Sequence, residues 1–322
     1  MGNLTIALLG IQGYGNTIGK KGTSTDVTLY NLKKGDDTVT FIEPTRYPER
    51  LAPLFYAASL SKKAVVVVDE LNAAFGECLV MLQCVKIYWG FFVLRNFITK
   101  DKISPLIKDT SLENFEFIED NPTLLRERLL AQASEARPEA EQNRKPGGTV
   151  PIDHSFNVKG VGAVVLGIVA DGEIQKHDSV RVLPGNKTAQ VRSIQKHDDE
   201  FDSAQQGDRV GLAMKNVEVE ELERGTVLTT DSSVKSANRV SSQATLVKYW
   251  QAPMKAEMVV HLGHWMQFIP ARIEAITDED DWHRPTLTLN LEKDLVYRRG
   301  DLAVISHLEG GKLRVAGNLQ LP

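Results

Sequence analysis

The hydrophobic pattern of this 322-residue chain changes near residue 150. Before that point, apolar runs of strand length alternate with longer segments whose apolar residues recur at helical spacing. After it, short apolar runs follow one another with only turns between them. The first pattern is typical of α/β domains, and the second of antiparallel sandwiches and barrels. We therefore expect a multidomain protein in which an α/β domain precedes an all-β part.

The first part, residues 1–130, alternates strand-like and helix-like segments. The runs LTIALLG, TVTFIEP, KAVVVVDE and GFFVLRNF predict strands, and KAVVVVDE has the β-branched composition of a buried parallel strand. The segments YPERLAPLFYAASL, AAFGECLVMLQCVKI and NPTLLRERLLAQ predict helices, the last of which begins at an Asn-Pro pair. We expect these helices to cover a mostly parallel sheet.

The all-β part divides into two blocks, residues 150–232 and 240–322. In the first block, Asp171-Gly172 and Pro184-Gly185-Asn186 are turn sequences between short strands. Two such blocks predict two antiparallel β-barrels. Residues 131–149 contain charged residues, Ala, Gln, Pro and Gly but no run that could form a core, so we expect the end of a helix followed by a linker.

Composition narrows the class of protein. A net charge of −4 and a pI near 6.0 do not indicate a globally basic nucleic-acid-binding protein, although local basic patches are compatible with them. Cys78 and Cys84 form neither a disulfide framework nor a metal-ligand set and indicate buried thiols in a reducing compartment. The sequence has no signal-peptide pattern and no apolar run that could span a bilayer. We expect a cytoplasmic monomer that does not enter a membrane.

The histidines give no indication of a metal centre. His261 and His264, for example, have no cysteine or carboxylate at ligand spacing in the sequence. Because zinc and similar metals need several such ligands, we expect no metal site.

Residues 150–231 resemble the second, β-barrel domain of the translation GTPases of the elongation factor Tu group. The resemblance is carried by Phe156 with VKGVGAVVLG, then by GDRVGLAM and EELERGTVL, in the order of the family. Within the group, the segment is most similar to the selenocysteine-specific elongation factors and their archaeal paralogues. The run VVHLGHWMQFIPARI resembles strands of the third domain. The resemblance implies a P-loop-GTPase-like α/β domain, two β-barrels and a role in translation.

A glycine-rich stretch, GIQGYGNTIGKKGTSTD, follows the first predicted strand, where phosphate-binding loops lie. Gly10 and Gly15 have the spacing of the GxxxxGK(S/T) loop, with Asn16 in place of the lysine that neutralises phosphate and Thr17 in place of the Mg²⁺ ligand. Asparagine is uncharged and too short to reach the phosphates. The glycines and β-branched residues that follow cannot form the helix whose N-terminus should hold the phosphate. We interpret the stretch as an abbreviated glycine-rich turn.

Three further nucleotide motifs are altered where the resemblance places them. Ser24 stands for the switch threonine, Glu43 and Arg46 for the aspartate and glycine of the DxxG turn, and Tyr47 for the histidine that positions water. Ile98 stands for the aspartate that reads guanine, and it cannot accept a hydrogen bond from the base. The family binds GTP and magnesium, but we expect neither to bind here and no active GTPase. A residual GTPase with displaced motifs is an alternative.

In the family, the second barrel holds the aminoacylated end of a tRNA. The resemblance places Gln195 near the carboxylate that contacts the terminal adenosine, and His154 at an arginine that helps to recognise the amino acid in the selenocysteine factors. Arg192 and His197 lie on the same segment as Gln195. We expect these four residues to contact the aminoacyl-tRNA end, with polar barrel surface as the alternative. The absence of the arginine argues against selenocysteine as the cargo.

Exposed cations are a second feature that could contact RNA phosphates. Lys20 and Lys21 precede a predicted strand, and Lys33-Lys34-Gly35 and Arg298-Arg299-Gly300 predict turns. Solvated turn charges are the alternative. We therefore expect a translation elongation factor-like protein that binds aminoacyl-tRNA, another RNA or the ribosome without hydrolysing GTP. A regulatory or interaction scaffold that binds protein partners is a further alternative.

Overall fold

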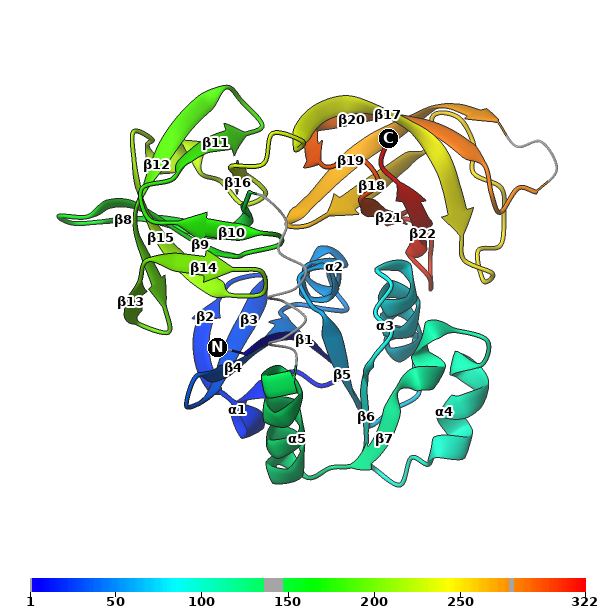
Figure 1. Cartoon of the computed structure of the whole chain (residues 1–322). Helices are drawn as coiled ribbons and strands as arrows, with labels where there is room; N and C mark the ends of the chain where they lie inside the picture. The colour runs from blue at the N-terminus through cyan, green and yellow to red at the C-terminus, as the bar shows by residue number, and fades with distance from the viewer. Residues whose placement is uncertain (1, 136–146, 278–280) are drawn as a thin grey trace. The chain divides into compact units, whose positions relative to one another are not determined.

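The computed structural model describes residues 2–135, 147–277 and 281–322 (Figure 1). Tertiary contacts divide the chain into two compact units. The first contains residues 1–138, 246–251 and 306–318, and the second contains residues 139–245, 252–305 and 319–322. Residues 136–146, most of the predicted linker, lie outside the described residues.

A seven-stranded sheet in the order β2-β3-β4-β1-β5-β6-β7 forms the centre of the first unit. The strands are β1 (Asn3–Leu9), β2 (Lys20–Ser24), β3 (Val27–Lys34), β4 (Asp37–Pro44), β5 (Lys63–Val68), β6 (Gly90–Leu94) and β7 (Glu116–Glu119). Strands β4, β1, β5, β6 and β7 are parallel, whereas β2 and β3 add an antiparallel edge. The prediction of a mostly parallel sheet is therefore confirmed.

Helices lie on both faces of this sheet (Figure 1). They are α1 (Gly15–Ile18), α2 (Ala52–Ser59), α3 (Ala73–Cys84), α4 (Lys100–Ile107) and α5 (Pro122–Glu135), with a 3-10 turn at Ser111–Asn114. Leu125 and Leu129 of α5 pack in the same core as Ile6 and Leu8 of β1, and burial of each such leucine stabilises the fold by about 1.5–3 kcal/mol. Asn72 caps the N-terminus of helix α3, where its side chain accepts a hydrogen bond from the Phe75 amide at 2.9 Å.

The first all-β block is a closed six-stranded barrel in the order β11-β16-β8-β9-β15-β12, closed by pairing of β11 with β12. Its strands are β8 (Thr149–Val158), β9 (Gly162–Ile168), β11 (Ser179–Leu183), β12 (Lys187–Lys196), β15 (Arg209–Lys215) and β16 (Val227–Thr229). Strand β13 (Asp199–Phe201) pairs with the outer edge of β12, and β10 (Glu173–Gln175) pairs with β14 (Ser203–Gln205).

The second block is a closed barrel in the order β17-β20-β19-β18-β21-β22. Its strands are β17 (Lys235–Leu246), β18 (Val259–His264), β19 (Gln267–Thr277), β20 (Thr286–Tyr297), β21 (Leu302–Ser306) and β22 (Val315–Gln320). The predicted fold class, an α/β domain followed by two antiparallel β-barrels, is thereby confirmed.

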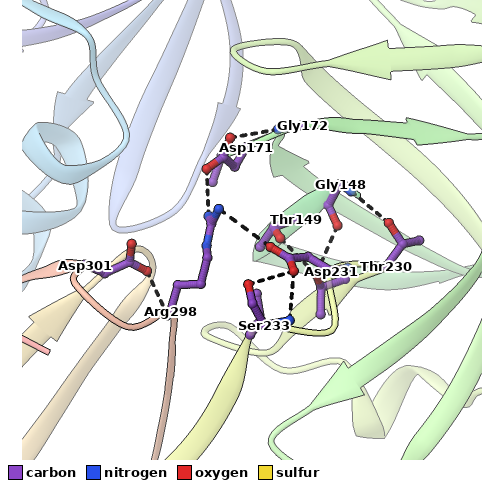
Figure 2. A network of polar contacts seen from close by, with 12 residues as sticks. Gly148, Thr149, Asp171, Gly172, Thr230, Asp231, Ser233, Arg298 and Asp301 are labelled. Carbon is purple, nitrogen blue, oxygen red and sulfur yellow. Dashed lines mark hydrogen bonds and ion pairs between the residues drawn. The ribbon is translucent and has the colours of Figure 1, made fainter. Parts of the chain in front are cut away.

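One arginine joins the two barrels within the second unit (Figure 2). Arg298 follows β20, and its guanidinium lies 2.7 Å from Asp171 Oδ2 and 3.6 Å from Asp231 Oδ2. The Asp301 carboxylate in turn accepts the Arg298 amide at 2.8 Å. Because the Arg298 side chain is only 16% exposed and is committed to two carboxylates, its interpretation as an exposed phosphate contact is wrong.

An apolar cluster supports the same joint. Leu183 and Val227 of the first barrel pack with Val234 of the connecting segment and Val296 of the second barrel, and Trp265 packs against them. The ion pairs and the apolar contacts therefore both hold the two barrels together.

Replacing Arg298 with alanine should lower the free energy of unfolding by about 3 kcal/mol, because two largely buried carboxylates then lose their counter-charge. The measurement is the midpoint of chemical unfolding, followed by the fluorescence of the tryptophans. Arg299→Ala removes an exposed arginine from the same turn and should change stability by no more than about 0.5 kcal/mol. Equal midpoints for the two variants would show that the Arg298 ion pairs contribute nothing net.

Candidate functional site

The glycine-rich loop follows β1 and needs glycine where it leaves the strand. Gly10 has a φ of +103°, and a Cβ at this position would lie 1.9 Å from the carbonyl oxygen of Val67. The side chains of Asn16 and Thr17 turn back onto the loop and donate to the carbonyls of Gly13 (3.0 Å) and Tyr14 (2.8 Å). Helix α1 ends after four residues. The loop is thus short, as the sequence predicts, but it opens a single helical turn where the sequence predicts no helix.

The Glu43 carboxylate binds the amides of this loop. Its Oε1 accepts from the Gly13 amide at 2.7 Å, and its Oε2 accepts from the Gly15 amide at 3.1 Å. These amides lie in the stretch whose backbone N–H groups bind phosphates in nucleotide-binding loops. Glu43 is 6% exposed, so the carboxylate is enclosed rather than solvated. An internal carboxylate therefore accepts from two amides of the loop in which the resemblance predicts phosphate binding.

Tyr30 closes the site from the side of β3. A Cβ on Gly15 would lie 2.2 Å from the Tyr30 ring, so the ring packs directly on the loop backbone. Burial raises the pKa of Glu43, and the hydrogen bonds from Gly13, Gly15 and Tyr30 with the charge of Lys21 only partly offset it. Burial also raises the pKa of Tyr30, as does the neighbouring Glu43. Glu43 thus lies in a desolvated site built from β3, β4 and the loop.

The turn after β4 holds two further predicted positions. Arg46, at the family's glycine, is exposed and has a φ of +60°, a left-handed conformation that is uncommon for residues other than glycine. The Tyr47 hydroxyl does not face the loop, and its single hydrogen is shared between the Ala74 carbonyl (2.8 Å) and Glu77 (3.1 Å) on α3. Ser24, at the end of β2, shares a hydrogen bond of 2.9 Å with Thr28.

The segment that corresponds to the guanine motif follows β6. Asn96 and Phe97 have φ values of +49° and +59°, and the Phe97 side chain is 99% exposed. Arg95 forms an ion pair of 3.0 Å with Asp120, whose carboxylate also accepts from the Tyr14 hydroxyl at 2.7 Å. Ile98 is partly buried. The polar groups of this segment are therefore used to fix loops of the chain itself.

On the first barrel, strand register brings His154 and Gln195 into one row. Glu200 of β13 pairs with Gln195 of β12, Gln195 with Gly211 of β15, Gly211 with Leu166 of β9, and Leu166 with His154 of β8. Directly paired residues of antiparallel strands lie on the same face. That face is the outer one, because the neighbours Val165, Ile194 and Leu212 are in the barrel core. We call these five positions the outer row.

The middle of the outer row has no side chain. A Cβ on Gly211 would lie 3.4 Å from Leu166 Cδ2 and 3.9 Å from Gln195 Cβ. Gly211 itself thus presents only backbone between the side chains of Leu166 and Gln195.

Glu200 is a candidate that sequence reasoning missed. The sequence has an amide, Gln195, where the family's carboxylate was sought, and the structure places a carboxylate directly across the strand from it. The hairpin turn could have revealed this pairing. His197 and Asp198 have φ values of +51° and +70° and form a two-residue turn, which fixes the register of β12 and β13.

The other two predicted residues of this site are not on the outer row. His197 lies in the hairpin turn. Arg192 occupies the bulge of β12 and donates to the Val161 carbonyl at 3.0 Å, so it fixes the β8–β9 turn. Beside the row, the rings of His154 and Phe156 lie 5.6 Å apart, and Phe156 is 37% exposed.

The four lysines that were predicted to contact phosphates lie on two neighbouring strands. Lys20 and Lys21 lie within β2 rather than before a strand, and Lys33 and Lys34 end β3. All four are exposed. Their role as phosphate contacts stays a prediction.

The thiols of Cys78 and Cys84 are free and buried, as predicted, and burial raises the pKa of each to about 12.

Within residues 2–135, 147–277 and 281–322, no group of three His, Cys, Asp or Glu side chains is arranged to hold a metal ion. In the same ranges, every helix is too short or too polar to cross a membrane.

Comparisons with known proteins show which proteins the fold and the first barrel resemble. Residues 162–229 match the family model of elongation factor Tu domain 2. The structure is similar to that of translation elongation factor SelB from Methanococcus maripaludis with the GTP analogue GppNHp, with a TM-score of 0.82 at 21% identity over 100% of this chain and 79% of that chain. This likeness defines an elongation factor fold.

Sequence relatives then give the family. The protein MJ0325 of Methanocaldococcus jannaschii, described as uncharacterized, is 35% identical over 98% of this chain and 99% of its own length. The selenocysteine-specific elongation factor of the same organism is 35% identical over 41% of this chain, which spans only 29% of that factor. This chain belongs to one family with MJ0325, which it matches along the full length, and its residues 162–229 match elongation factor Tu domain 2.

Replacing Glu43 with glutamine should lower the free energy of unfolding by about 1–3 kcal/mol, because the new amide group cannot accept from one of the two loop N–H groups. Glu43→Ala removes both acceptors and should lower the free energy of unfolding further. Glu49→Gln changes an exposed carboxylate just beyond the same turn and serves as the matched control. The measurement is thermal unfolding by circular dichroism. A Glu43→Ala variant as stable as the control would mean that water replaces the carboxylate without cost.

Proposed function

We propose that this chain is a translation elongation factor-like protein that binds the end of an aminoacyl-tRNA and acts without binding or hydrolysing GTP. The observation that carries the proposal is the Glu43 carboxylate on the amides of Gly13 and Gly15. A bound γ-phosphate needs those N–H groups and a nearby cation. Here the N–H groups already have an anionic partner, and Asn16 brings no charge in place of the lysine.

The same carboxylate disfavours a nucleotide by repulsion. A phosphate that approached the loop would meet a second negative charge in a desolvated site, where electrostatic interactions are strong. Displacing Glu43 would leave a carboxylate without its two hydrogen bonds. Loss of the nucleotide switch is therefore favoured by the geometry of one side chain as well as by the missing motif residues.

The outer row supports the RNA part of the proposal. The Glu200 carboxylate can accept from a ribose 2′-hydroxyl, and the Gln195 amide can both donate and accept. The bare backbone at Gly211 lets a base lie close to the barrel. Unpaired RNA ends are recognised by such stacking and hydrogen bonding of the base and by contact with the 2′-hydroxyl.

The charge of this surface indicates what the row would contact. Asp198, Asp199 and Glu200 are exposed at the β12–β13 hairpin, so phosphates would be repelled there. Recognition would then rest on the hydroxyls and base of the terminal nucleotide rather than on its phosphate. Binding energy from this row should accordingly depend little on salt.

A scaffold for protein partners is the second candidate function. It is favoured by Phe97, whose side chain is 99% exposed at the end of β6. A fully solvated phenylalanine at a loop tip is a common feature of protein interfaces, in which aromatic residues are enriched.

GTP with Mg²⁺ should not raise the melting temperature of this protein. A ligand present at 100 times its Kd would stabilise it by about 2.7 kcal/mol, which a thermal-shift measurement detects readily. The comparison is with ATP at the same millimolar concentration, which controls for non-specific ionic effects. A clear rise with GTP alone would overturn the nucleotide part of the proposal and favour the residual GTPase.

Charged tRNA should bind more tightly than uncharged tRNA, and the outer row should matter for both. Gln195→Ala and Glu200→Gln should each weaken binding by about 1–2 kcal/mol, or roughly 5- to 30-fold, with an unchanged salt dependence. Glu292→Gln, an exposed change on β20, should have no effect. Filter binding at two salt concentrations measures this. Equal affinity of all four proteins for both tRNAs would leave the protein scaffold as the better reading.

A further inference from the structure

A single buried carboxylate joins three segments of the first compact unit. Glu77, on α3, is 3% exposed. Its Oε1 accepts from the amide (3.0 Å) and Nε (3.1 Å) of Arg314, and its Oε2 accepts from Arg314 Nη2 and from the Tyr47 hydroxyl (3.1 Å). Arg314 lies between β21 and β22, in the part of that stretch that belongs to the first unit. We call Tyr47, Glu77 and Arg314 the Glu77 cluster.

The Glu77 cluster is built to hold an ionised pair. A buried carboxylate is costly unless its oxygens are hydrogen-bonded, and here Arg314 donates three hydrogen bonds to it. The Tyr47 hydroxyl adds a contact, sharing its hydrogen between Glu77 and the Ala74 carbonyl. The hydrogen bond to Glu77 is also the main reason that the pKa of Arg314 is raised. A second contact anchors the same segment, since Asn318 donates to the carbonyl of Cys84 at the end of α3 at 3.1 Å. Segment 306–318 is thus fixed to α3 at two points.

Tyr47 extends the cluster to the glycine-rich loop. Its hydroxyl contacts α3, and its carbonyl accepts from the Gln12 side chain at 3.1 Å. Tyr47 lies four residues after Glu43, whose carboxylate binds the same loop. Hydrogen bonds therefore connect the loop through Tyr47 and Glu77 to Arg314.

We propose that the Glu77 cluster is a permanent latch that couples the glycine-rich loop to segment 306–318 without any nucleotide. In switch proteins, a bound γ-phosphate orders the corresponding turn and its loss releases it. Here the turn is held by Gln12 on one side and by α3 on the other. The proposal rests on these contacts within the free protein and does not depend on RNA binding.

Hydrogen exchange of the free, full-length protein tests the coupling. Tyr47→Phe deletes only the hydroxyl, and we expect the amides of 306–318 to exchange about three- to tenfold faster, the change that loss of one typical hydrogen bond produces. Gln12→Ala, which contacts only the loop side of Tyr47, should accelerate the same amides to a smaller extent. Tyr249→Phe, at a 46% exposed tyrosine of the same unit, is the matched control.

The outcomes separate coupling from a local ion pair. Faster exchange at 306–318 in both Tyr47→Phe and Gln12→Ala supports the latch. If Arg314→Lys accelerates those amides but Tyr47→Phe and Gln12→Ala do not, the ion pair is local and the latch is overturned. Should Arg314→Lys fail to fold, the two milder variants decide alone. Because no tRNA or nucleotide is present, failure here leaves the proposed function untouched.

Discussion

The arrangement of the first unit depends on where one carboxylate finds its hydrogen bonds. Glu43 is the penultimate residue of β4, and the amides it binds lie 30 and 28 residues earlier in the chain. A phosphate-binding loop without phosphate has exposed donors that need water or another anion. By supplying that anion from within, the chain keeps the loop, β3 and β4 in one packed arrangement. The turn after β4 is positioned as a result, and with it the contacts on α3.

Much of the fold was predictable because its signals are local. The run KAVVVVDE gave β5 and the Asn-Pro pair gave α5, since burial and capping act within a few residues. Strand β7, with four residues, and the largely exposed β2 carry too little pattern to be found. Among site residues, the outer row followed from register once β13 was known. Neither the Glu43 contacts nor the buried pairing of Arg298 could be predicted from the sequence. Each joins segments that are far apart in the chain and that only the tertiary fold brings together.

Charged residues have two different uses in this molecule. Glu77 and Arg298 are enclosed and paired with opposite charges, so they fix segments of the chain. The acidic hairpin of the first barrel and the lysines of β2 are exposed to solvent, so a partner could reach them. A near-neutral overall charge therefore says little about what the surface binds, since the local fields differ from place to place.

The two-residue hairpin between β12 and β13 has a consequence for how this barrel can change. A strand alternates its faces with a period of two, so inserting one residue at His197 or Asp198 would shift the register of β13 by one. Glu200 would then turn away from Gln195, and Phe201, which packs against the core, would turn outward. Relatives that alter the length of this turn should therefore present a different set of side chains on the outer face even where every strand residue is retained.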